Sequence, residues 1–425
     1  MENAPASMLR LRCWTLLLQA ALTLYPTLLP AAEPNQRITV GGLGYGQFSF
    51  SIRATSSGIA DKLKTNLLWS GLYRYTADSA NSDIRIELEY IPNRKIAAFI
   101  DSRWGRRYFA YEKSALDGEA LEPQKAIEQI ALHLTGEPNH MGNAIVYVEK
   151  GDFPGYRIVL TDPFGERRKV LVEDGNLNIL PRWNADATSI LFTSLSKSGS
   201  RIKQYRFADS RTETFLSGKS KFSGGTWGKN GEIILTISKG GNSDLYRIDQ
   251  RGAILERLTS RTSTESNPRW SPDGKRLVFI SNRSGSIQIY QRDLETGEVN
   301  RMTYEGGANV EPNWSGNGAY IVFAGMRNGR FQIFFMDREG EYVRQITDGP
   351  HSSEQPVWSP RGRQILFVSK RHYHSKLYIV NADGSHKRRV TRSDSGINEF
   401  NPDWTENFDW ASYYNRQPTS THRHE

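Results

Sequence analysis

The sequence predicts a mainly β protein, a six-bladed β-propeller preceded by a small α/β (α+β) N-terminal domain. Two observations carry this prediction: tryptophans recur every 43 to 46 residues along the last two thirds of the chain, and the same strand pattern follows most of them. The six tryptophans are Trp183, Trp227, Trp270, Trp314, Trp358 and Trp404, and five of them end a Pro-x-Trp triplet. A period of about 40 to 45 residues is typical of a propeller blade, a small sheet that buries its faces against its neighbours.

Each repeat unit contains a turn and three predicted strands. Four tryptophans open a turn related to the Ser-Pro-Asp-Gly sequence at 271–274, in which Pro presets φ and Gly accepts a positive φ. The first strand of each unit is rich in β-branched and aromatic residues. These strands are expected at 144–148, 189–194, 232–238, 276–281, 320–325 and 364–369. The count predicts six blades over residues 142–405.

The regular tryptophans are predicted to pack between blades, because large aromatic side chains dominate core burial. The Asp-Gly turns are not expected to bind calcium, since a calcium loop needs several carboxylates at alternate positions and a bidentate Glu. We therefore assign no metal-binding residues and no cofactor, and the sequence leaves open whether an ion binds in the propeller channel.

Residues 1–32 are predicted to be a secretory signal peptide. Two arginines precede an apolar stretch that ends near Leu29, and the small residues Ala31 and Ala32 follow. An uncleaved membrane anchor is the alternative, but the stretch is short for a span and contains a proline. Because Cys13 is the only cysteine, the mature chain is expected to have neither disulfides nor a free thiol.

Residues 33–141 are predicted to form the small N-terminal domain. Its expected elements are a strand at 37–40, a helix from Ser56 or Ser57 to Gly71, strands at 72–75, 84–90, 95–101 and 106–113, and a helix at 123–134. Serine caps a helix start and glycine permits the left-handed helix end. Alternating apolar and polar residues predict an antiparallel meander with one solvated face. Residues 406–425 are expected to be a partly disordered tail.

The composition is that of a globular protein with an excess of basic residues. Hydrophobic residues make up 37% and charged residues 24%, with a formal net charge of +9. This charge favours anionic partners such as lipopolysaccharide, peptidoglycan or an acidic lipoprotein face, or it is ordinary solvated surface charge. Nucleic acid is not expected as a partner, because no basic motif is interleaved with aromatic residues.

The chain is not expected to be an enzyme. It contains no Gly-x-Ser-x-Gly elbow, and the segment after the last blade is too short for the hydrolase domain of peptidases that carry this repeat. His372 and His374 alternate as in a strand, but the third protein ligand that a zinc site requires is missing nearby.

Three short segments narrow the choice among propellers: Leu-Trp-Ser-Gly-Leu-Tyr at 68–73, Leu-Thr-Gly at 134–136 and Ile-Val-Tyr-Val at 145–148. With the order of the domains, they resemble the TolB family, the periplasmic component of the Tol-Pal system in Gram-negative bacteria. The resemblance implies a non-enzymatic periplasmic scaffold that supports outer-membrane integrity, cell division and protein translocation. Its implied partners are a Pal-type lipoprotein, which links it peripherally to the outer membrane, and a TolA-type inner-membrane protein. We expect a monomer.

The resemblance also implies where these partners bind. Pal-facing residues are expected in the loops just before each Pro-x-Trp, because loops at one rim of a propeller converge on its central opening. They are Lys221, Ser223, Gly224, Glu265, Ser266, Asn267, Asn309, Glu311, Ser353 and Glu354. The TolA-contacting segment is expected at Glu33, Pro34, Asn35 and Gln36. For each rim residue, capping of a turn or simple solvation is the alternative interpretation.

Two departures from the family pattern limit these assignments. The second Pro-x-Trp position reads Gly225-Thr226-Trp227 and lacks the proline, and the N-terminal domain lacks one strand of the usual pattern between Tyr75 and Ser82. Two other functions remain open: a propeller that binds a polysaccharide or small ligand outside the Tol system, and a propeller related to prolyl-oligopeptidase-type peptidases without a catalytic domain.

Overall fold

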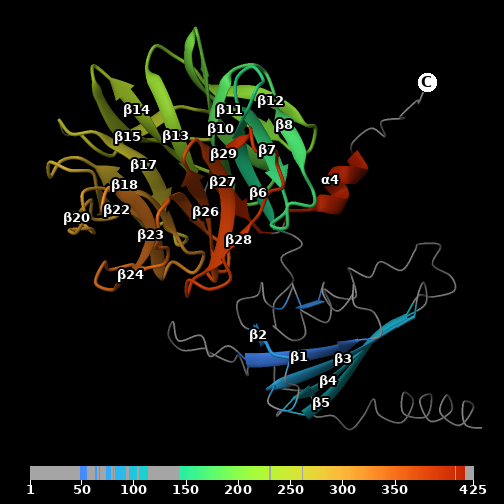
Figure 1. Cartoon of the computed structure of the whole chain (residues 1–425). Helices are drawn as coiled ribbons and strands as arrows, with labels where there is room; N and C mark the ends of the chain where they lie inside the picture. Colours follow the sequence, from blue (N-terminus) through green and yellow to red (C-terminus); the bar gives the residue numbers. More distant parts are fainter. Residues whose placement is uncertain are drawn as a thin grey trace, which may run out of the picture. The chain divides into compact units, whose positions relative to one another are not determined.

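Figure 1 shows the computed structural model of the chain. It describes residues 48–54, 63–64, 67, 73–77, 80, 82–91, 95–102, 105–112, 143–228, 231–260, 262–406 and 408–416. The predicted signal peptide, the strand at 37–40, the helix at 123–134 and the tail beyond 416 lie outside the described residues.

The N-terminal part contains a five-stranded sheet of order β2-β1-β3-β4-β5. Its strands are β1 (Phe48–Ala54), β2 (Tyr73–Tyr75), β3 (Ile84–Ile91), β4 (Lys95–Ser102) and β5 (Gly105–Glu112). The predicted antiparallel meander is confirmed for β3, β4 and β5. Strand β1 was not predicted, and it lies in parallel between β2 and β3.

Alternation along β3 follows the predicted division into a buried and a solvated face. Ile84, Ile86 and Leu88 are buried, whereas Arg85 and Glu87 are exposed. The helical residues Leu63 and Leu67 are also fully buried, as expected for positions four apart on one helix face.

The propeller consists of six four-stranded antiparallel sheets, which confirms the predicted blade count. Each blade is named here by its inner strand, the strand that carries the periodic tryptophan. The first three blades, from the inner to the outer strand, are β29 (Asn398–Thr405), β6 (Ala144–Lys150), β7 (Arg157–Thr161), β8 (Lys169–Val172); β9 (Leu177–Trp183), β10 (Ser189–Ser196), β11 (Gly199–Arg206), β12 (Arg211–Leu216); and β13 (Lys221–Trp227), β14 (Ile233–Lys239), β15 (Asn242–Ile248), β16 (Ile254–Arg257). The other three are β17 (Glu265–Trp270), β18 (Arg276–Ser281), β19 (Gln288–Asp293), β20 (Val299–Arg301); β21 (Asn309–Trp314), β22 (Tyr320–Arg327), β23 (Arg330–Asp337), β24 (Val343–Gln345); and β25 (Ser352–Trp358), β26 (Gln364–Arg371), β27 (His374–Asn381), β28 (Arg388–Arg389).

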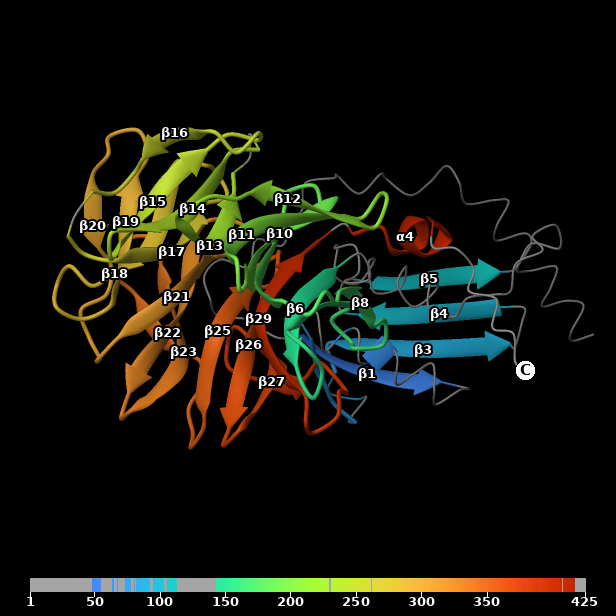
Figure 2. The ribbon, with the colours of Figure 1, turned by 90° about the horizontal axis from the view of Figure 1, so that it is seen from above.

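The ring closes by pairing the two ends of the propeller sequence. Strand β29 is the inner strand of the sheet that also contains β6, so Trp404 lies opposite Ile145 and Phe400 opposite Val148. Figure 2 shows these two strands side by side, β6 in green and β29 in red. Closure removes the exposed sheet edges that an open array of blades leaves at its ends.

The tryptophans pack between blades, as predicted. Trp314 of β21 shares a core cluster with Val278 and Ile289 of the preceding blade. Trp358 of β25 contacts the ring of Phe335 in the same way, at a centroid distance of 5.7 Å. The regular spacing of the tryptophans therefore reflects packing, because each blade contributes one large ring to the interface with its neighbour.

Serine and threonine recur at fixed positions in several repeat units because they form hydrogen bonds with the backbone. In three turns, the serine after the tryptophan accepts a hydrogen bond at its Oγ from the backbone N–H five residues on, at 2.9 to 3.0 Å. In three blades, the threonine after the outer strand accepts one from the third strand, at 2.9 to 3.0 Å. These side chains satisfy backbone N–H groups where the ladders end.

A short helix, α4 (Trp410–Arg416), follows the last strand. Phe408, Trp410 and Tyr413 join the buried cluster around Trp183, and Trp410 Nε1 donates a hydrogen bond to the Asn143 carbonyl at 3.2 Å. The first part of the predicted tail is thus ordered against the propeller. No helix in the described part of the chain is long and apolar enough to cross a membrane.

Candidate binding site in the propeller centre

Each inner strand contains one β-bulge, three residues before its tryptophan. The pairing with the second strand is irregular at this point in all six blades. The residue at the bulge has a positive φ, between 47° and 57°. These six bulge residues are Leu180, Gly224, Asn267, Glu311, Gln355 and Asn401.

The bulge explains the Pro-x-Trp triplet. In five blades a proline follows the bulge residue, and proline is tolerated there because the ladder is already interrupted and needs no N–H. The β13 blade has Gly224 and Gly225 instead, and glycine adopts a positive φ without strain. The prediction that the segments before the triplets are loops is therefore wrong. The residues predicted to face Pal lie in the inner strands β13, β17, β21 and β25.

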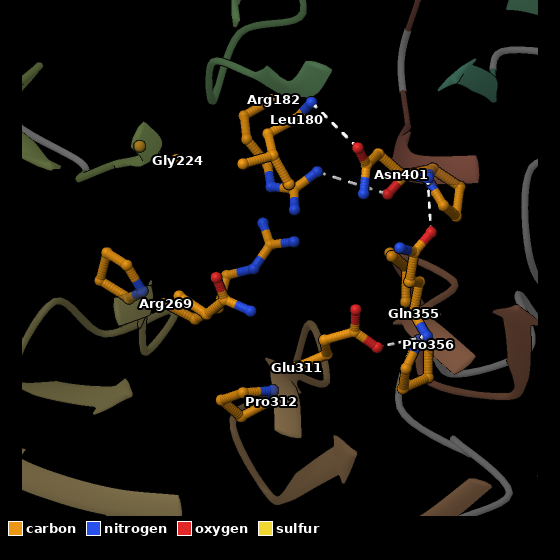
Figure 3. Close-up of a pocket in the computed structure, with 14 residues that line it drawn as sticks. Leu180, Arg182, Gly224, Arg269, Glu311, Pro312, Gln355, Pro356 and Asn401 are labelled. Atoms are coloured by element: carbon orange, nitrogen blue, oxygen red, sulfur yellow. Dashed lines mark hydrogen bonds between the residues drawn. The ribbon is translucent and has the colours of Figure 1, made fainter. Parts of the chain in front are cut away.

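The six bulge residues meet at the centre of the ring, where they line one cavity (Figure 3). We call it the central cavity. Four prolines that follow bulge residues, Gly225, Val357 and the two arginines Arg182 and Arg269 complete its wall. It contains about 470 Å³ of space free of protein atoms, part of it open to solvent.

Four of the bulge residues form a relay of hydrogen bonds from one blade to the next, in which three side chains each accept the backbone N–H of the following bulge residue. The Glu311 carboxyl accepts the Gln355 N–H at 2.7 Å, and Gln355 Oε1 accepts the Asn401 N–H at 2.6 Å. Asn401 Oδ1 in turn accepts the Leu180 N–H at 3.3 Å. The relay satisfies N–H groups that the bulges release from the ladders, and it ties four blades together around the cavity.

Both arginines of the cavity wall directly precede a tryptophan, as does Asp403, which pairs with one of them. Arg269 Nη1 lies 3.4 Å from Asp403 Oδ1, and Asp403 Oδ2 accepts the Trp183 N–H at 2.9 Å. Arg182 Nη1 donates to the carbonyls of Pro181 and Pro402, at 2.7 and 3.5 Å. Figure 3 shows the two guanidinium groups pointing toward one another.

Burial perturbs the acid–base properties of this cluster. It lowers the pKa of Arg182 to about 9, and the nearby charge of Arg269 lowers it further. Burial also lowers the pKa of Arg269, whereas Asp403 opposes that shift. The pKa of Glu311 is raised to about 7, mainly by burial, against the hydrogen bond from Gln355.

Three of the ten predicted Pal-facing residues line the central cavity: Gly224, Asn267 and Glu311. The other seven do not. Among them, Lys221 is exposed, Ser223, Ser266 and Glu354 are partly buried, and Glu265, Asn309 and Ser353 are buried. Glu354 forms an ion pair with Lys370. The predicted TolA segment, Glu33 to Gln36, lies outside the described residues.

Burial of two of these polar residues has a structural reason. Glu265 accepts a hydrogen bond from Ser281 Oγ at 2.8 Å and pairs with Arg283 at 3.2 Å. Asn309 Nδ2 donates to Gln288 Oε1 at 2.7 Å and to the Glu305 carbonyl at 2.8 Å. These side chains satisfy groups within and between adjacent blades.

The sequence interpretation missed eleven of the fourteen cavity residues, and among them are the bulge residues Leu180, Gln355 and Asn401 and the arginines Arg182 and Arg269. The periodic tryptophan is the signal that could have found these five, because they stand one or three positions before it. Within the described ranges, no group of three or more His, Cys, Asp or Glu side chains is arranged to hold a metal ion.

A family model described as the TolB beta propeller domain matches residues 132–407. "Protein TolB homolog" of Chlorobium luteolum is 31% identical over 151 residues, which is 35% of this chain and 34% of that protein. "Tol-Pal system protein TolB" of Anaeromyxobacter dehalogenans is 30% identical over 155 residues, 36% of this chain and 35% of that protein. The chain thus matches about a third of the length of these curated relatives.

The chain also resembles a solved structure over most of its length. The crystal structure of TolB from Acinetobacter baumannii superposes with a TM-score of 0.71 at 21% identity, covering 84% of this chain and 96% of that one. At this identity the likeness concerns the fold.

Proposed function

Because the chain belongs to the family of TolB β-propeller domains, we propose that it is a non-enzymatic scaffold of the Tol-Pal system in the periplasm. Its main partner in this proposal is a Pal-type lipoprotein bound at one rim of the propeller. That contact associates it peripherally with the outer membrane and supports membrane integrity, cell division and protein translocation. The proposal also includes a contact between Glu33–Gln36 and a TolA-type protein, and a monomeric state.

The charge distribution of the propeller supports one rim as the binding face. In every blade, the hairpin between the second and third strands lies beside the start of the inner strand. All six hairpins carry basic residues, and we call this face the basic rim. Its basic residues are Lys150, Lys197, Lys239, Arg283, Arg327, Arg330, Lys370 and Arg371. Arg283 and Lys370 pair with Glu265 and Glu354, so the other six basic residues carry the positive charge that attracts an acidic protein surface.

Exposed aromatic side chains lie on the same rim. Tyr373, in the β26–β27 hairpin, is 92% exposed, and Tyr304, which precedes β21, is 72% exposed. Tyrosine is enriched among the residues that dominate the energy of protein interfaces. The basic rim therefore offers both the charge and the aromatic anchors that a protein partner requires.

The single observation that carries the proposal is the family match over residues 132–407. Its test is a binding measurement with the lipid-free Pal-type lipoprotein of the same organism. Arg371→Glu on the basic rim is expected to weaken binding at least about tenfold. Arg251→Glu, in an exposed turn at the opposite rim, is the matched control and should bind like the wild type.

Two results would contradict the proposal. One is the absence of saturable binding at micromolar concentrations, which would favour a propeller that serves another ligand. The other is an equal loss of binding in both variants, since general electrostatic attraction does not require a particular rim.

A further inference from the structure

The central cavity contains more positive than negative charge. Arg182 and Arg269 both end in it with their guanidinium groups facing one another (Figure 3). Asp403 pairs with Arg269, whereas within the described part of the chain the hydrogen bonds of Arg182 go to two carbonyl oxygens. Glu311, the other carboxyl group, has a pKa of about 7 and is only partly ionised at neutral pH.

Two like charges that are held together away from water repel each other strongly, because the screening of the solvent is lost. An anion between them would replace that repulsion with two attractive contacts. We propose that the central cavity binds one carboxylate group between the guanidinium groups of Arg182 and Arg269. The proposal rests on the residues of the cavity and does not depend on the partner proposed above.

Charge and shape both favour a carboxylate over other anions. Asp403 already pairs with Arg269, so one further negative charge balances the two guanidinium groups, whereas a dianionic phosphate exceeds that charge and lies close to both carboxyl groups. A planar carboxylate also matches the fork of a guanidinium group. The proline rings, Leu180 and Val357 line the wall with apolar surface, which reduces screening and strengthens the contact.

A carboxylate can reach this cavity from two sources, a small organic acid or an acidic side chain of a bound protein. Calorimetric titration of the full chain with sodium acetate at pH 7 tests the shared chemistry. We expect one site per chain, with chloride and phosphate at least about tenfold weaker in parallel titrations at equal ionic strength.

Three arginine variants test the assignment. Arg182→Gln removes one guanidinium without breaking the ion pair between Arg269 and Asp403, and it should weaken acetate binding roughly tenfold or more. Arg182→Lys keeps the charge and should recover part of the affinity. Arg251→Gln, at an exposed turn, should bind acetate like the wild type.

Glu311→Gln provides a second test if Arg182→Gln does not fold. This variant cannot acquire the negative charge of Glu311, so at pH 8 it should bind acetate more tightly than the wild type, and at pH 5.5 equally. Glu311 is faced by Arg182, Arg269 and Lys370, which attract its charge, and by Glu354, which repels it.

The source of the carboxylate is identified by a peptide with blocked ends and one central glutamate, compared with its glutamine counterpart. Selective binding of the glutamate peptide supports a protein side chain as the source, and binding of acetate alone supports a small acid. The inference is overturned if acetate shows no saturable binding, if chloride binds equally well, or if folded Arg182→Gln retains the wild-type affinity.

Discussion

Replacing Glu311 by glutamine should stabilise the protein above neutral pH and leave it unchanged in acid. Burial raises the pKa of Glu311 to about 7 from an ordinary value of 4.5. The folded state therefore holds this proton more tightly than the unfolded chain does. Stability from this group is full below pH 4.5 and is lost as the pH rises through 7. At 1.36 kcal/mol per pKa unit, complete ionisation removes roughly 3 kcal/mol.

The assay is thermal unfolding of the wild type and Glu311→Gln at pH 5 and pH 8. The amide keeps an oxygen that can accept the Gln355 N–H, so the relay is retained. At pH 8 the variant should be more stable by roughly 3 kcal/mol, and at pH 5 this difference should fall below about 1 kcal/mol. Glu305→Gln makes the same chemical change at an exposed position and should have no such pH dependence.

Two outcomes would refute this reasoning. An equal gain at both pH values would mean that packing, and not ionisation, distinguishes the amide from the acid. A loss of stability at pH 8 would mean that Arg182 and Arg269 hold Glu311 as a stable carboxylate.

Two further predictions concern the packing of the propeller and its bulges. Trp410→Ala should lower the free energy of unfolding, measured in urea, by roughly 3 to 5 kcal/mol, because the indole packs on Phe408 at a centroid distance of 5.0 Å and its N–H reaches the Asn143 carbonyl. Tyr304→Ala, at an exposed site, should change that free energy by about 0.5 kcal/mol or less. Equal effects of the two variants would place α4 outside the core. Gln355→Ala and Gln355→Gly both remove the acceptor for the Asn401 N–H, but alanine also keeps the strain of the positive φ and should be less stable by about 1 kcal/mol in thermal melts. The reverse order would mean that the bulge relaxes when the side chain is removed.

The propeller could be predicted from sequence because its period is imposed by packing. Each blade must place a large ring against its neighbour, so tryptophans such as Trp314 and Trp358 recur independently of the residues on the surface. The turns were equally predictable, since proline, glycine and a serine acceptor act locally. Pairing of β29 with β6 agrees with the six-blade count but joins segments that are distant along the chain.

The inner strands could not be predicted because the bulge destroys their periodicity. A positive φ at Asn267 or Gln355 followed by a proline breaks the alternation of buried and exposed residues that identifies a strand. Polar residues such as Glu265 and Asn309 then suggest a loop, although hydrogen bonds from neighbouring strands allow them to be buried. The same bulge places Arg182 and Arg269 in the central cavity, where only their fixed position before the periodic tryptophan indicates them.

We propose that the basic rim is the face of the propeller that binds a protein partner. A photo-crosslinking side chain at Tyr373, on the basic rim, compared with one at Tyr342, which is 49% exposed in a turn at the opposite rim, tests it most directly. We expect the Pal-type lipoprotein to crosslink at position 373 and not at position 342. Crosslinking at position 342 alone, or equally at both positions, would contradict it.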